Sequence, residues 1–140
     1  MDKRISLVTL GCRDVPRARA FYEAIGWSGP TVIGDHTVFW QAGGMVFGLW
    51  KRDEMNRATR LEDDGGYGGV TLAYNVGSPE EVDAVMAEVE RAGGRVTAPP
   101  ETAFWGGYTG VFADPEGHAW EGAHTPGWTL NEAGSISLGD

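Results

Sequence analysis

The chain has 140 residues, a length that suits one domain or two small half-domains sharing a core. Its 20 acidic residues outnumber its 11 lysines and arginines, so the formal net charge is -9 at pH 7. This balance argues against nucleic acid and an anionic membrane as partners, because both attract a cationic surface. One cysteine cannot form an internal disulfide or a CxxC site, and no run approaches the ~20 apolar residues of a membrane span. We therefore expect a cytoplasmic protein.

The first half of the chain predicts a strand, a helix and three further strands. Residues 5–10 are mostly apolar and suit a strand. The helix should begin after the capping residue Asp14 and stop at Gly26. A hairpin turn at Gly43 and Gly44, with a positive φ expected at both, joins the last two strands. The three strands after the helix are predicted at residues 31–33, 36–42 and 45–49.

The second half repeats this order. Residues 70–74 predict a strand, and Ser78, Pro79 and Glu81 form the pattern of a capping box at the start of a helix. That helix should stop at Gly93. Three short strands are then expected at residues 96–98, 109–113 and 118–123. Because there are only two copies, we expect two halves of one fold rather than a solenoid.

Two segments resemble a known superfamily. In residues 8–22 a strand, an aspartate and a helix ending in Phe21 and Tyr22 follow one another; in residues 106–121 an Asp-Pro-Glu-Gly turn precedes a strand bearing Glu121. Together they resemble the vicinal oxygen chelate superfamily, which includes glyoxalase I, bleomycin resistance proteins and extradiol dioxygenases. The resemblance implies an α+β fold of two βαβββ modules that form a curved mixed sheet around a cleft, with helices outside. It also implies a homodimer.

We expect one glyoxalase-like domain with two modules. Module one is placed at residues 4–50 and module two at residues 69–124. Residues 51–68 join them as a linker, whose mixed charges suit either a solvated segment or a short surface helix. Residues 125–140 form a C-terminal tail that leaves the sheet and could pack along an edge.

Metal binding is tested by the ligand positions that the resemblance implies. Catalytic members hold a divalent ion with His, Glu or Gln from the first and last strands of each module, and the ion polarises two substrate oxygens. Here those positions carry Leu7, Gly48, either Val70 or Thr71, and Glu121. One carboxylate cannot hold a catalytic ion, so we predict no metal. We also predict no other cofactor, since no phosphate-binding glycine motif lies between a strand and a helix.

The histidines and the cysteine do not supply an obvious replacement. His36, His118 and His124 are expected at the surface or at strand ends. An acid-base role for His118 and His124 stays open as an alternative. Cys12 is expected to be a small buried or half-buried residue, because nothing in the sequence places a base beside it.

Strand alternation assigns the faces of the first hairpin. One face is apolar and suits packing under helices: Val38, Trp40, Met45, Phe47 and Leu49. The other face mixes apolar and polar groups, as ligand clefts do: Thr37, Phe39, Gln41, Val46, Gly48 and Trp50.

Pairing Asp114 with His118 assigns the faces of the second hairpin in the same way. Phe112 and Trp120 then lie on the helix side, and the opposite face carries Thr109, Val111, Ala119, Glu121 and Ala123. Trp105 and Tyr108 precede this hairpin and either line the mouth of the cleft or cap the core. The candidate ligand-binding residues are Thr37, Phe39, Gln41, Gly48, Trp50, Trp105, Tyr108, Val111 and Glu121.

These observations favour a metal-independent protein that binds a small molecule, aromatic or cationic, as bleomycin resistance proteins do. An enzyme of the same fold is the alternative, acting on a small carbonyl or carboxylate substrate. It would use either unexpected metal ligands or Glu121 as a general base. A third possibility is an interaction protein with a vestigial cleft.

Overall fold

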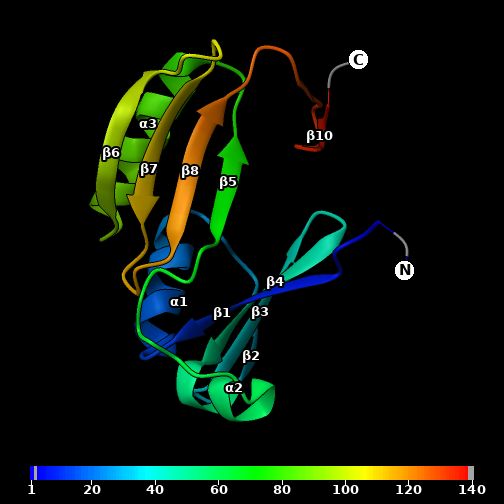
Figure 1. Cartoon of the computed structure of the whole chain (residues 1–140), viewed down its shortest axis with the longest axis vertical. Helices are drawn as coiled ribbons and strands as arrows, with labels where there is room; N and C mark the ends of the chain where they lie inside the picture. The colour runs from blue at the N-terminus through cyan, green and yellow to red at the C-terminus, as the bar shows by residue number, and fades with distance from the viewer. Residues whose placement is uncertain (2, 139–140) are drawn as a thin grey trace. The chain divides into compact units, whose positions relative to one another are not determined.

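The computed structural model describes residue 1 and residues 3–138 of the chain. The chain divides into two compact units, Met1–Gly66 and Tyr67–Asp140, here called unit 1 and unit 2. Each unit contains a strand, a helix and three further strands in that order (Figure 1). The predicted α+β fold with two βαβββ modules is therefore confirmed. Residues 139 and 140 of the predicted tail lie outside the described residues.

Unit 1 is built on one four-stranded sheet. Its order is β1-β4-β3-β2, in which β1 is parallel to β4 and the other neighbours are antiparallel. The strand β1 extends beyond the predicted residues 5–10, because Gly11 and Cys12 pair with Trp50 and Lys51. The elements of this module are β1 (Leu7–Cys12), α1 (Val15–Ala24), β2 (Thr31–Ile33), β3 (Thr37–Ala42) and β4 (Met45–Lys51).

Helix α1 supplies one side of the core of unit 1. As predicted, Asp14 caps it, and its carboxylate accepts a hydrogen bond from the backbone N–H of Arg17 at 3.0 Å. The helix buries Val15, Ala18, Phe21 and Tyr22. The sheet contributes the buried side chains of Val38, Trp40, Phe47 and Leu49, four of the five residues predicted for this face. Packing under the helix therefore leaves the alternate residues of the sheet on the opposite face.

The β3–β4 hairpin has the predicted register, with Ala42 opposite Met45 and Phe39 opposite Gly48. The expectation of a positive φ at both turn glycines is wrong. Gly43 has a φ of 61°, whereas the φ of Gly44 is not positive. A turn with positive φ only at its first central residue is typical of type II′, which requires glycine at that position alone.

Helix α2 (Arg52–Thr59) follows β4 directly, so the segment after module one contains a short helix. It packs against β1 and β4. A Cβ atom at Gly11 would lie 2.9 Å from the Met55 Cε and 3.3 Å from the Arg52 Cγ, so both side chains of α2 lie close against the strand at Gly11. Gly11 alternates with the buried Leu10, which faces the core. Helix α2 therefore lies on the face of the sheet away from α1.

Unit 2 repeats the arrangement with its strands in the order β5-β8-β7-β6. Helix α3 packs across β6, β7 and β8 (Figure 1) and buries Val82, Met86 and Val89. Beneath it Phe112 and Trp120 stack with ring centroids 6.2 Å apart, on the helix side as predicted. The elements are β5 (Thr71–Asn75), α3 (Pro79–Arg91), β6 (Arg95–Thr102), β7 (Tyr108–Ala113) and β8 (Ala119–His124).

Strand β6 is longer than the predicted residues 96–98. It continues through Pro99 and Pro100 with two register shifts against β7. Proline lacks a backbone N–H and is tolerated at bulges and on an edge strand, and β6 is at the edge of its sheet. The two prolines made the sequence resemble a loop although the chain stays extended.

The residues after β8 form a small hairpin of their own, with β9 (Thr129–Leu130) antiparallel to β10 (Ile136–Ser137). Among the described residues, no helix has the length and apolar character needed to cross a lipid bilayer.

Candidate functional site

Unit 1 carries a groove on the face of its sheet away from α1. We call it the unit 1 groove. Its volume is about 470 Å³, and three of the predicted ligand-binding residues line it: Thr37, Phe39 and Trp50. The other lining residues are Leu7, Thr9, Ile33, His36 and Glu54. Leu7, Ile33, Phe39 and Trp50 make the groove largely apolar, as small-molecule sites usually are.

Gly48 lies beneath this groove, paired with Thr9 on one side and Phe39 on the other. A Cβ atom at Gly48 would lie 3.0 Å from the Phe39 ring and 3.4 Å from the Thr9 Oγ1. The aromatic ring therefore rests against the space that a side chain at this position would enter. The glycine allows an apolar wall at the place where the family resemblance implies a metal ligand.

A polar cluster closes one end of the unit 1 groove. The Trp50 Nε1–H donates a hydrogen bond of 3.1 Å to the Glu54 Oε2, and the His36 Nδ1 lies 3.8 Å from the same oxygen. The His36 Nδ1 is also 2.9 Å from the Thr37 Oγ1. The sequence did not single out His36 or Glu54 as site residues. The available signal was the spacing of four residues between Trp50 and Glu54, which a helix beginning at residue 52 brings together.

The amide of Gln41 belongs to the hairpin turn rather than to the groove. It donates hydrogen bonds to the carbonyl oxygens of Gly43, at 2.6 Å, and Met45, at 3.2 Å. Gln41 shares the face of Phe39, as predicted, but it does not line the groove. These two hydrogen bonds to carbonyl oxygens of the turn account for a polar residue at position 41.

Unit 2 carries a second groove, the unit 2 groove, of about 500 Å³. It contains the predicted residues Val111 and Glu121, together with Thr71 and Arg95. Val111 and Glu121 are paired across β7 and β8, as the sequence predicted. The Thr109 hydroxyl donates a hydrogen bond of 2.9 Å to the Glu121 Oε1, which fixes the direction of the carboxylate. The groove therefore holds one oriented carboxylate and one guanidinium.

Tyr108 does not share the face of Glu121. It alternates with Thr109 along β7 and lies on the helix side, where its hydroxyl donates a hydrogen bond of 2.8 Å to the Asp83 carboxylate of α3. This hydrogen bond, followed by desolvation, raises the pKa of the Tyr108 phenol. Trp105 lines neither groove; its ring folds over Gly107 in the loop before β7. The sequence predicted neither the Tyr108–Asp83 hydrogen bond nor the Trp105–Gly107 contact.

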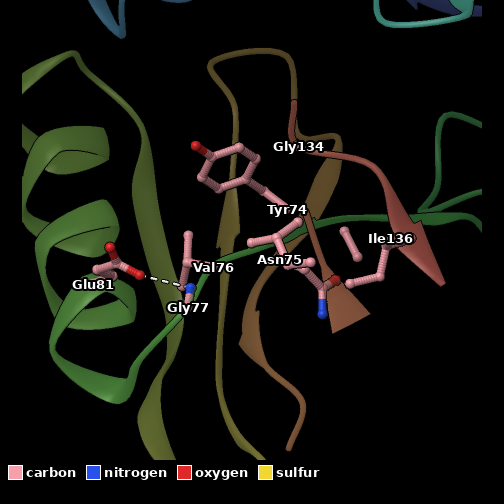
Figure 2. A pocket seen from close by; sticks show the side chains of 9 residues that line it. Tyr74, Asn75, Val76, Gly77, Glu81, Gly134 and Ile136 are labelled. Atoms are coloured by element: carbon pink, nitrogen blue, oxygen red, sulfur yellow. Dashed lines mark hydrogen bonds between the residues drawn. The ribbon is translucent and has the colours of Figure 1, made fainter. Parts of the chain in front are cut away.

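A third hollow, of about 390 Å³, lies between the carboxyl end of β5 and the β9–β10 hairpin (Figure 2). Figure 2 shows the Glu81 carboxylate turned toward Gly77, whose backbone N–H it binds at 2.6 Å. Ser78 caps the same helix by accepting from the Glu81 N–H at 3.2 Å. Glu81 therefore adds a second contact at the helix start, to the residue before the N-cap instead of to Ser78 itself.

His118 and His124 each make a ring-nitrogen contact with a nearby turn or backbone oxygen. The His118 Nδ1 is 2.8 Å from the Asp114 Oδ2, and the buried Asp114 also accepts from the backbone N–H groups of Glu116 and His118. The His124 Nδ1 is 3.3 Å from the Val76 carbonyl oxygen. These contacts support the expected structural roles at strand ends. Cys12 is fully buried, as expected.

The arrangement of strands and the Asp-Pro-Glu-Gly turn can now be compared with known proteins. The model of the Glyoxalase/Bleomycin resistance protein/Dioxygenase superfamily matches residues 4–121. The chain belongs to this superfamily. The match includes both glyoxalase-type modules and ends at Glu121. Among curated protein sequences, none matches the chain.

Solved structures support the same assignment. A glyoxalase-related enzyme from Fulvimarina pelagi is 30% identical, with a TM-score of 0.91 and coverage of 99% of this chain and 100% of that one. A glyoxalase/bleomycin resistance protein/dioxygenase family enzyme from Burkholderia phytofirmans is 20% identical, with a TM-score of 0.74 over 85% and 96% of the chains. A lactoylglutathione lyase from Agrobacterium tumefaciens is 21% identical, with a TM-score of 0.70 over 90% and 96%. At these lower identities the last two show the fold alone.

The residues at the superfamily's metal positions do not fit a divalent ion. In unit 1, Leu7 and Gly48 offer no ligand atom, and the Phe39 ring rests against Gly48. In unit 2, Thr71 is the residue that faces the groove with Glu121, and its hydroxyl is 2.5 Å from the Tyr67 hydroxyl. Within the part of the chain that the structure describes, no three His, Cys, Asp or Glu side chains gather as a possible metal site. A borderline or hard divalent ion needs more donors than this set provides.

Proposed function

We propose that this glyoxalase-superfamily chain binds a small organic molecule without a metal ion, in the manner of bleomycin resistance proteins. The observation that carries the proposal is the unit 1 groove. It has aromatic and aliphatic walls and a glycine where a metal ligand would be needed. Burial of a ligand's apolar surface between Phe39 and Trp50 is the main source of affinity in such a site.

The proposed contacts come from both units, and each groove is considered by itself. In the unit 1 groove they are Thr37, Phe39 and Trp50, with Gly48 beneath them. In the unit 2 groove they are Val111 and Glu121. Gln41, Trp105 and Tyr108 line neither groove: Gln41 binds within its turn, the Trp105 ring lies over Gly107, and Tyr108 binds Asp83 of α3. A cytoplasmic location is part of the proposal and agrees with a single buried cysteine.

An enzymatic function is the second candidate, and one observation favours it. The relative from Fulvimarina pelagi, 30% identical over its whole length, is described as a glyoxalase-related enzyme. Glu121 is the residue we would assign as general base, since Thr109 holds its carboxylate in one direction. The substrate would be a small carbonyl or carboxylate compound. In this alternative Glu121→Gln would abolish turnover, whereas simple binding does not require a base.

Metal content and ligand affinity, measured on the same preparation, test the main proposal. We expect purified protein to contain less than one tenth of an equivalent of any divalent metal. We also expect planar aromatic ligands from a compound panel to quench tryptophan fluorescence equally with and without a chelator. Phe39→Ala should weaken that binding about tenfold or more by removing a wall. Trp128→Phe is the control, because Trp128 lines neither groove.

Two results would contradict the proposal. One is a stoichiometric divalent ion that is lost in Glu121→Ala. The other is a panel from which no compound changes the fluorescence of the wild-type protein. Turnover of a carbonyl substrate that disappears in Glu121→Gln would favour the enzymatic alternative.

A further inference from the structure

The unit 1 groove has titratable side chains at one end only. Of the eight residues that line the groove, Glu54 is the one acidic side chain and His36 is the other that titrates. The remaining lining residues are aliphatic, aromatic or threonine. A ligand in this groove would therefore meet hydrocarbon along most of its length and a carboxylate at one end.

The carboxylate is held in place by the fold. Glu54 lies on α2, four residues after Trp50 at the end of β4, so the turn from strand to helix brings the two side chains together. The Trp50 Nε1–H binds the Glu54 Oε2 at 3.1 Å. Among the described residues, no hydrogen bond reaches the other oxygen, Oε1. Glu54 is partly exposed, with 34% of its side chain accessible, so a ligand can reach it.

The arginines of α2 lie close to other carboxylates rather than to Glu54. On α2, Arg52 is bonded to Asp63, and Arg57 lies 3.8 Å from the Asp53 carboxylate. The His36 Nδ1, 3.8 Å from the Glu54 Oε2, is the neighbour that shares the groove with Glu54. A chain with a net charge of -9 adds a field that attracts cations over a longer range.

We propose that Glu54 recognises a protonated amine on the ligand, whose apolar or aromatic body lies against Phe39 and Trp50. A charge-assisted hydrogen bond from an ammonium N–H to the Glu54 Oε1 fits the free oxygen, and an aromatic wall beside the cation adds to the attraction. Trp50 acts twice, as a wall and as the donor that positions the carboxylate. This inference rests on the proposed function but assigns charge recognition to α2 rather than to Glu121.

A matched pair of probes tests the assignment. 1-Naphthylmethylamine is a cation at pH 8, and 1-naphthalenemethanol has the same ring system with a neutral hydroxyl. Binding is measured by calorimetry and by backbone amide NMR shifts on the full chain. We expect the amine to bind more tightly than the alcohol and to shift amides of β3, β4 and α2. Glu54→Gln should weaken amine binding by roughly 10- to 100-fold, the range for a lost charge-assisted hydrogen bond. It should change alcohol binding by less than about twofold.

The controls separate this inference from the general proposal. Asp53→Asn removes the same charge from the same helix at a side chain outside the groove, so it should leave both probes unaffected. Trp50→Phe keeps an aromatic wall but removes the N–H donor to Glu54. It should weaken binding of the amine more than binding of the alcohol. Equal loss of both probes in Glu54→Gln, or loss of the amine only in Glu121→Gln, would overturn the role of Glu54 while small-molecule binding stands. If neither probe binds at millimolar concentration, the amine assignment is wrong; the fluorescence panel then decides the proposed function separately.

Discussion

At the scale of single residues, Gly48 decides what the unit 1 groove can bind. In a strand, glycine has no side chain to pack, so its presence needs a local reason. Here the reason is the Phe39 ring, which lies 3.0 Å from the position of a Cβ atom at Gly48. The aromatic wall of the groove and the absence of a ligand side chain are therefore two consequences of glycine at position 48.

A methyl group at this position should disturb the groove. In Gly48→Ala the new Cβ would press on Phe39, so the ring must shift and the wall of the groove is disturbed. We expect ligand affinity to fall several-fold while the free energy of unfolding changes by only about 1 kcal/mol. Fluorescence titration and chemical denaturation measure the two effects. Combining Gly48→Ala with Phe39→Leu should relieve the contact, because leucine is smaller than phenylalanine. If the loss of affinity in this double variant equals the sum of the losses in the two single variants, the explanation is wrong.

At the scale of elements, α2 is the part of the molecule that shapes the groove without belonging to either βαβββ repeat. It is anchored at its start, where Arg52 binds both oxygens of Asp63 at 2.5 Å, and the Asn56 amide binds one of them at 2.9 Å. The hydrogen bond from Arg52, followed by those from Asn56 and the Gly65 N–H, holds the pKa of Asp63 well below its usual range. The same helix carries Glu54.

The lowered pKa of Asp63 predicts how the chain responds to acid. Because the pKa is below 3.8 in the folded state, the carboxylate stabilises the fold above about pH 4. That contribution should be lost as the pH falls from about 4 toward 2. Asp63→Asn should therefore show a flatter dependence of unfolding free energy on pH in this range, measured by urea denaturation at several pH values. Parallel profiles for the two proteins would show that the ion pair adds nothing to stability.

At the scale of the whole molecule, the chain is a repeat of one module whose two copies have diverged in their grooves. Unit 1 presents Phe39 and Trp50 over a glycine, whereas unit 2 presents Glu121 and Arg95. The first strands, β1 and β5, are edges of their sheets. An edge strand has unpaired backbone groups, which favour association with another chain or module.

We expect the protein to be a homodimer in solution, as the superfamily resemblance implies. Light scattering after gel filtration should give twice the chain mass of 15.0 kDa. Trp128 is 44% exposed in the C-terminal segment and is our candidate anchor. Trp128→Ser should shift the distribution toward the single-chain mass at low micromolar concentration. A wild-type protein that stays at the single-chain mass up to high concentration would exclude the homodimer.

The sequence by itself determined the order of elements within each βαβββ module, the helix caps at Asp14 and Ser78, and the register of both hairpins. These depend on contacts between residues close in the chain: alternation along strands, hydrogen bonds within a helical turn, and glycines in tight turns. The superfamily also followed from the sequence, because its Asp-Pro-Glu-Gly turn is such a local pattern.

Only the tertiary structure decided which side chains share a groove. His36 and Glu54 lie near each other because α2 packs against β1 and β4, and the two residues are far apart in the chain. Strand alternation puts Tyr108 on the face opposite Glu121, and its hydroxyl finds its partner in Asp83 of α3. Such choices depend on which distant partner satisfies each polar group, and that is set by packing of the whole unit.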